Sequence, residues 1–213
     1  MAQLVLPLAT SPALRREDFI VAPGNREAVA FLDAWPHWPS HIAALHGPPG
    51  SGKSHLAAIW AERAKAHVVA AADLDESVLL RGGPIAVEDA GEGTGDAILF
   101  SLIESGRQIL FTARRPPAQW HASMPDLASR YRALLSFALW APDDELLAAL
   151  ARKLFADRQL QVPDAAIAQM INSLERSPAA IRDFVARADE IALSQKRAVS
   201  VALIREILSG AQP

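Results

Sequence analysis

The chain has 213 residues, of which 51% are hydrophobic and 21% charged, so it is long enough to bury a core and falls in the ordinary globular class. Its net charge of −3 does not indicate a protein that binds the phosphates of nucleic acid. The lack of cysteine in the sequence excludes disulfides, thiolate metal sites and cysteine nucleophiles.

The first residues are apolar and precede any element that could cover them. Residues 2–8 read AQLVLPL. One interpretation is a first β-strand or a core plug, and the other is an extended peptide for the pocket of another protein. In the second interpretation, the restricted φ of Pro7 reduces the entropy lost on docking. The contacts would come from Gln3, Leu4, Leu6, Pro7 and Leu8.

The sequence predicts neither a signal peptide nor a membrane span. No basic region followed by a long apolar core stands at the N-terminus, because Pro7 interrupts the apolar stretch. The Ala-rich segments are repeatedly cut by charges and prolines, so no window approaches 18 uninterrupted apolar residues. We therefore expect a cytoplasmic protein that does not bind membranes.

A strand, a glycine loop and a helix follow one another between His41 and Ala64. Residues 42–45 form an apolar run typical of a buried parallel strand, residues 47–54 match G-x-x-x-x-G-K-[ST], and residues 56–64 read as a helix. This order points the loop amides and the helix N-terminus at one anion. Lys53 would reach the β- and γ-phosphates of ADP or ATP, and the Ser54 hydroxyl would coordinate Mg²⁺. The candidate nucleotide-binding residues of this segment are Pro48, Pro49, Gly50, Ser51, Gly52, Lys53, Ser54 and His55.

A second apolar run ends in two carboxylates. Residues 84–90 read PIAVEDA, which fits the strand whose acidic end holds magnesium or orients water in P-loop proteins. Successive side chains of a strand point to opposite faces, so only one of Glu88 and Asp89 faces the metal directly. The register favours Glu88 as the ligand and leaves Asp89 open. The alternative is two solvated carboxylates at a strand end.

Further strands alternate with helices as far as residue 139. Short apolar runs at 67–71, 108–112 and 136–139 predict strands, and residues 96–106 predict a helix stopped by glycine. This alternation predicts a three-layer α/β domain with a parallel sheet and its ligand at the carboxyl ends of the strands.

From Pro142 onward the pattern is helical. Leucines recur every four residues at 146, 150 and 154, and apolar residues at helical spacing recur in 163–175, 177–193 and 201–208. We expect a small α-helical lid domain over residues 142–213. Before this lid we expect a partner-binding peptide and linker over residues 1–15 and then an α/β nucleotide-binding domain over residues 16–141.

Two further stretches make the chain similar to a known family. FTARRPP at residues 111–117 and MPDLASRYRA at residues 124–133, together with the P-loop and the helical lid, resemble the DnaA-related branch of the AAA+ ATPases over roughly residues 18–208. The implied fold class is α/β, with a P-loop AAA+ parallel-sheet core and a small all-α lid. QLVLPL ahead of a bare AAA+ module resembles the Hda-type regulators of this branch, which inactivate the initiator DnaA together with the sliding clamp.

The resemblance implies roles for individual residues. In that family the N-terminal peptide binds the DNA polymerase III β sliding clamp, which assigns this role to residues 3–8. Arg130 matches the arginine finger, which would stabilise transition-state charge on ATP bound to neighbouring DnaA. Arg132 is its local competitor, and a surface arginine is the alternative. Two other matches are Thr112 at the sensor 1 position and the base-contacting pair Ile20 and Val21.

The sequence also departs from this family. An ungapped comparison places Ala179 where the family carries the sensor 2 arginine, and the order Glu88 then Asp89 is unusual. We therefore expect weak intrinsic ATP turnover. Residues 72–83 are too few for the DNA-engaging helical insertion of the initiator, and no helix-turn-helix domain follows the lid, so we expect no direct sequence-specific DNA binding.

Three hypotheses follow from the sequence. The first is a nucleotide-bound regulator that joins the sliding clamp to DnaA and stimulates hydrolysis of DnaA-bound ATP. The second is an autonomous P-loop ATPase that acts as a DnaA-like initiator or as a helicase or transposase loader. The third is a scaffold with a vestigial P-loop. Self-association is left open.

Overall fold

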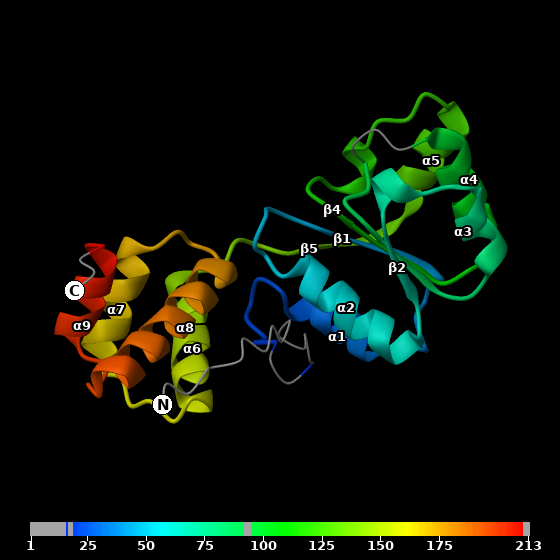
Figure 1. Ribbon diagram of the computed structural model, residues 1–213. Helices are drawn as coiled ribbons and strands as arrows, with labels where there is room; N and C mark the ends of the chain where they lie inside the picture. Colours follow the sequence, from blue (N-terminus) through cyan, green and yellow to red (C-terminus); the bar gives the residue numbers. More distant parts are fainter. Residues whose placement is uncertain (1–15, 17–18, 92–94, 211–213) are drawn as a thin grey trace.

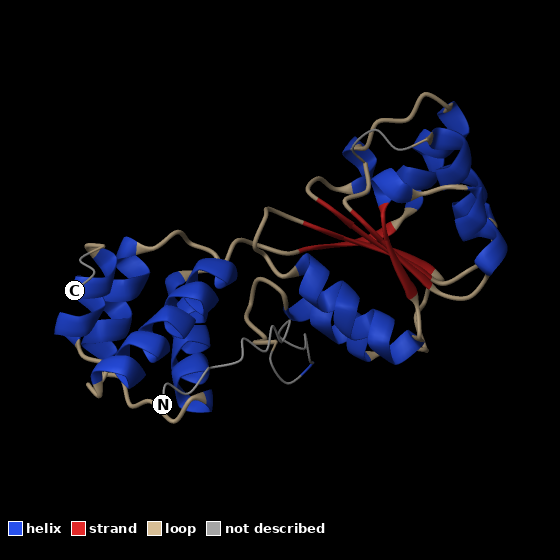
Figure 2. Cartoon of the chain, viewed as in Figure 1, coloured by secondary structure: helices blue, strands red, loops and turns tan. Residues whose placement is uncertain are grey.

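The protein consists of an α/β unit and a helical unit joined by one extended connection (Figure 1). The computed structural model describes residue 16 and residues 19–91 and 95–210. All described strands lie in the α/β unit, and the other unit contains only helices and loops (Figure 2). Among the described residues, no helix is both long and apolar enough to cross a membrane.

The α/β unit alternates strands and helices along the chain. Its strands are β1 (Ile42–His46), β2 (His67–Ala70), β3 (Ile85–Glu88), β4 (Ile109–Ala113) and β5 (Leu135–Ala138). Its helices are α1 (Arg26–Asp33), α2 (Lys53–Ala64), α3 (Glu76–Arg81), α4 (Asp96–Glu104) and α5 (Pro125–Ala133), with short 3₁₀ turns η2 (Ala71–Asp73) and η3 (Pro117–Gln119). Every strand expected from the sequence is present.

The five strands form one parallel sheet in the order β2-β3-β4-β1-β5. The residues of β4 and the first three residues of β3 are all buried, because helices cover both faces of the sheet. This confirms the predicted α/β class. Since all strands run the same way, the glycine loop after β1, the acidic end of β3 and the end of β4 come together at one edge.

Two hydrophobic cores fill the two faces of the sheet. On one face, Trp60 of α2 is 1% exposed and packs with Leu45 of β1 and with residues of α1. On the other face, Phe111 of β4 packs with Tyr131 of α5 and with residues of α4. The helices that carry these side chains are thereby fixed against the sheet, which positions their ends at its carboxyl edge.

The helical unit has a separate core. Its helices are α6 (Asp144–Asp157), α7 (Asp164–Ser173), α8 (Pro178–Gln195) and α9 (Val201–Leu208). Phe155, Met170, Ile181 and Leu203, one from each helix, are at most 1% exposed and belong to one cluster. The four expected helices are therefore present, and they bury their apolar faces against one another.

Side-chain caps set where three of these helices begin. Asp143 accepts a hydrogen bond from the Leu146 amide at 2.8 Å, and the Ser177 hydroxyl accepts one from the Ala180 amide at 3.1 Å. Ser200 caps α9 in the same way at 3.3 Å. Each cap satisfies an amide that has no partner within its helix and contributes about 1 kcal/mol.

Candidate nucleotide-binding site

The glycine loop after β1 adopts backbone angles that only glycine takes easily. Gly50 has φ +74° and Gly52, the N-cap of α2, has φ +95°. A β-carbon on Gly52 would lie 2.9 Å from Cε2 of Phe19, and one on Gly47 would collide with the carbonyl oxygen of Leu139. The loop can therefore keep this shape only with glycine at these positions.

Lys53 is buried inside the loop. It is 7% exposed, and its Nζ donates hydrogen bonds to the carbonyl oxygens of Gly47 and Pro48, each at 2.8 Å. Burial lowers the pKa of Lys53, Arg114 lowers it further, and Asp89 acts in the opposite direction. Among the described residues, no carboxylate is hydrogen-bonded to this ammonium. The ammonium therefore gains from a bound anion, and the loop fits the phosphates of a nucleotide.

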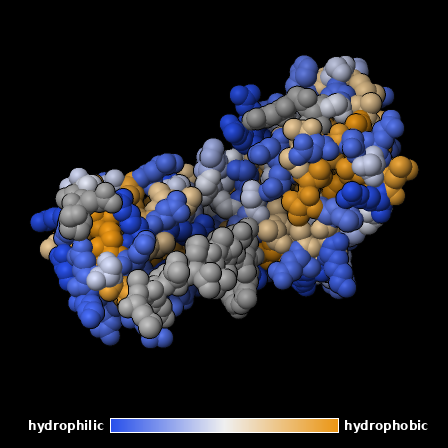
Figure 3. Space-filling model, viewed as in Figure 1, coloured by the Kyte–Doolittle hydropathy of each residue, from blue (hydrophilic) through white to orange (hydrophobic). Residues whose placement is uncertain are grey.

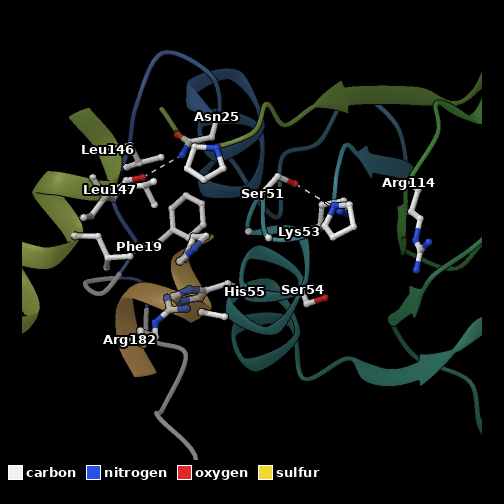
Figure 4. A pocket seen from close by; sticks show the side chains of 18 of the residues that line it. Phe19, Asn25, Ser51, Lys53, Ser54, His55, Arg114, Leu146, Leu147 and Arg182 are labelled. Atoms are coloured by element: carbon white, nitrogen blue, oxygen red, sulfur yellow. Dashed lines mark hydrogen bonds between the residues drawn. The ribbon is translucent and has the colours of Figure 1, made fainter. Parts of the chain in front are cut away.

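A cavity of about 370 Å³ opens over this loop and extends to the helical unit. Residues 49–55 form its phosphate end, and side chains of α6 and α8 face them from the other unit (Figure 4). Leu146, Leu147 and Leu150 make the α6 side apolar. A polar end beside an apolar end suits a ligand that carries phosphates on an aromatic base.

Asp89, and not Glu88, lines this cavity. Asp89 follows β3 with φ +54°, so the strand alternation ends before it, and its amide donates to Oγ1 of Thr112 at 3.3 Å. Glu88 is the last residue of β3 and is not among the residues that line the cavity. Ser54 and Asp89 are among the side chains with oxygen atoms that line this cavity, and they are the candidates to hold Mg²⁺. The role of Glu88 as a metal ligand stays a prediction.

Thr112 lies in β4 and is 1% exposed. Its hydroxyl oxygen accepts a hydrogen bond from the Asp89 amide, and its carbonyl oxygen accepts one from the Ala90 amide at 2.8 Å, so Thr112 holds the turn after β3. Thr112 does not itself line the cavity. Its sensor role therefore stays a prediction, and the structure adds a positioning contact to it.

The segment before α1 forms the wall of the apolar end. Ile20 and Phe19 line the cavity, whereas Val21 is 45% exposed and does not. The Phe19 ring meets the His55 ring edge-on at 5.2 Å. Asn25, 6% exposed, donates from Nδ2 to the Ile20 carbonyl at 3.0 Å and accepts from the Ala22 amide at 2.9 Å, which fixes this wall.

The helical unit contributes a cation that sequence comparison missed. Ala179, which the sequence comparison placed at the sensor 2 position, lines the cavity, and Arg182, one turn further along α8, lines it as well (Figure 4). Residues three apart share one face of a helix, which was the available signal. Arg114, after β4, is a second cation at the cavity that was not predicted.

Arg130 lies away from this cavity, on α5. Its side chain is 54% exposed, and its Nε lies 3.0 Å from Oε1 of Glu104, itself 43% exposed. Arg132 on the same helix is also exposed. Neither arginine is buried in its own fold. The candidate peptide Gln3, Leu4, Leu6, Pro7 and Leu8 lies outside the described residues.

The fold is that of AAA+ proteins with solved structures. Domain III of the replication initiation protein DnaA from Thermotoga maritima is 19% identical over 92% of this chain and 95% of its own, with a TM-score of 0.71. An A156S mutant of RuvB from the same organism is 17% identical over 91% of this chain and 70% of its own, with a TM-score of 0.72.

A third similar structure is DnaA bound to AMPPCP and single-stranded DNA, 16% identical over 87% of this chain and 68% of its own, with a TM-score of 0.68. No protein-family model and no curated protein matches the chain. These likenesses confirm the P-loop AAA+ core with a helical unit. At such identities they establish the fold and leave the activity to be argued from the residues.

Proposed function

We propose that this protein is an Hda-type regulator of replication initiation. In this proposal it binds ADP or ATP with Mg²⁺ and the DNA polymerase III β sliding clamp, and it stimulates hydrolysis of the ATP bound to DnaA. The DnaA-like fold supports the family assignment. The protein acts in the cytoplasm and makes no direct sequence-specific contacts with DNA.

The observation that carries the proposal is the placement of Arg130. A finger that works on a partner must lie outside its own nucleotide cavity and reach the surface, and Arg130 meets both conditions. Its ion pair with Glu104 is solvent-exposed on both sides, and such pairs contribute about 0–1 kcal/mol. A phosphoryl group of a neighbouring nucleotide can therefore displace Glu104.

The rest of the chain supports this role in distinct parts. Residues 1–15 supply the clamp-binding peptide and linker, residues 16–141 the nucleotide-binding domain, and residues 142–213 the lid. A nucleotide held between the last two parts stabilises the module that presents Arg130. Intrinsic turnover is weak, since Ala179 stands at the sensor 2 position.

The test is a reconstituted assay with DnaA, ATP and clamp loaded on DNA. Arg130→Ala is expected to abolish the stimulated hydrolysis while clamp binding persists, and Gln3→Ala to weaken clamp binding. Arg132→Ala is the matched control because it removes an exposed guanidinium from the same helix. Full stimulation of hydrolysis by the Arg130→Ala variant contradicts the proposal. Loss of stimulation in Arg132→Ala but not in Arg130→Ala would identify Arg132 as the arginine finger.

A second function is favoured by the cavity itself. Lys53, Ser54 and Asp89 gather in it, which is the minimal set for hydrolysis with magnesium. An autonomous ATPase, acting as an initiator or as a helicase or transposase loader, would turn over ATP alone. Lys53→Ala and Asp89→Ala would then abolish that turnover. A rate for the isolated wild type no higher than that of these variants excludes this alternative.

A further inference from the structure

A second cavity, of about 270 Å³, lies at the same edge of the sheet, beyond Arg114. It is bounded by the turn after β3 and by the segment between β4 and α5, which includes η3. Arg114, Arg115, Gln119, Trp120 and His121 line it. We propose that this cavity binds an oxyanion, either a phosphate group or a carboxylate.

The walls of this cavity are held in place by Trp120. The indole is 7% exposed and its Nε1 donates to the Arg115 carbonyl at 2.8 Å, which closes the loop between them. Its ring packs edge-on against Phe111 at 5.6 Å and Tyr131 at 5.0 Å. Gly91, with φ +87°, lies against the ring so closely that a β-carbon would come within 2.6 Å of Cδ1. The cavity is thus shaped before any ligand binds.

The chemistry of the lining selects anions. Two arginines, a histidine and a glutamine line one cavity, and none of the described lining residues is Asp or Glu. Guanidinium forks match the oxygens of phosphates and carboxylates. His121 interacts electrostatically with Asp96, and Arg114 already has another interaction partner among the described residues. Arg115 is therefore the lining cation to test.

Arg114 lines both cavities. An oxyanion in the second cavity partly neutralises the guanidinium that also faces the P-loop. The field at Lys53 therefore changes with occupancy, and by linkage each ligand alters the affinity of the other. The second cavity is thus coupled to the nucleotide site without overlapping it.

The test uses inorganic phosphate, and sodium acetate in parallel, on the full chain at constant ionic strength. The measurements are made in a Lys53→Ala background, which weakens the P-loop as a competing phosphate site. Calorimetric titration is expected to show one phosphate site, weakened about tenfold by Arg115→Ala through loss of a charge-assisted hydrogen bond. Arg26→Ala, which removes an exposed arginine on α1, is the control and leaves the affinity within about twofold.

A second variant protects the test from loss of folding. Gln119→Glu keeps both arginines and adds a carboxylate to the cavity, so it too is expected to weaken phosphate binding. Tighter binding of phosphate than of acetate identifies a phosphate ligand, and the reverse order identifies a carboxylate. Binding that is the same in Arg115→Ala and Gln119→Glu as in the background, or no binding of either anion, overturns the proposal.

Discussion

Replacing Lys53 by alanine is expected to remove most of the stabilisation that ADP gives to the folded protein. The Lys53 ammonium lies 2.8 Å from the carbonyl oxygens of Gly47 and Pro48, inside the glycine loop. A hydrogen bond to a charged group contributes about 1.5–3 kcal/mol. Its loss therefore raises the dissociation constant of ADP by about 10- to 100-fold.

These values fix the expected shift in melting temperature. At a concentration about 100 times the wild-type Kd, ADP stabilises the wild type by about 2.7 kcal/mol. The same concentration stabilises Lys53→Ala by only about 0.4–1.4 kcal/mol. For a chain of this length 1 kcal/mol corresponds to about 2–4 °C, so the shift falls from about 5–11 °C to about 1–6 °C.

The assay is thermal unfolding followed by circular dichroism, with and without ADP and Mg²⁺. Lys65→Asn is the matched control, because Lys65 is exposed at the other end of α2 and asparagine tolerates its φ of +52°. An ADP-induced shift in Lys53→Ala equal to that of Lys65→Asn would refute the assignment of Lys53 to the phosphates.

Three other predictions test the surroundings of the cavity. Arg182→Ala is expected to weaken ADP binding about tenfold, whereas Arg176→Ala, which removes the exposed partner of Asp144, leaves it within about twofold in a calorimetric titration. Burial and the charge of Lys53 lower the pKa of His46. Its stabilising contribution is present above about pH 6.5, the pKa in the unfolded chain, and is lost as pH falls through the lower folded-state pKa. The melting temperature of the wild type should therefore drop more steeply on acidification than that of His46→Gln, and parallel curves contradict this. Gly47→Ala is expected to lower the free energy of unfolding by about 3 kcal/mol or more, because the added methyl group would collide with the Leu139 carbonyl oxygen. An unchanged midpoint of urea unfolding would contradict this and show that the loop rearranges to accept the methyl group.

The fold could be predicted from the sequence because its local signals agree with one another. The runs that became β1, β3 and β4 are buried on both faces and are therefore almost entirely apolar, with polar residues only at or next to their carboxyl ends. The helices after residue 142 show the spacing that their shared core requires. The strand order was not available from the sequence, because it depends on contacts between segments far apart in the chain.

The candidate site could be predicted only where one segment carries it. The P-loop is such a segment: of its candidate residues 48–55, all but Pro48 line the cavity, and their role in nucleotide binding stays a prediction. The choice between Glu88 and Asp89 depended on extending the strand alternation by one residue, and the positive φ of Asp89 ends that alternation. Arg114 comes from a separate element that joins the site only in the folded chain, so no local pattern indicated it. The spacing of Ala179 and Arg182 on one helix was a local signal, but the approach of that helix to the P-loop was not available from the sequence.

The nucleotide cavity is built by two units with independent cores, and the chain passes from one unit to the other through the connection after β5. A ligand that contacts both units favours the angle between the units at which both sets of contacts can form. The bound nucleotide is then in effect part of the tertiary structure. If this cavity holds a nucleotide, a protein that docks across the two units would sense which nucleotide is bound through the angle between the units.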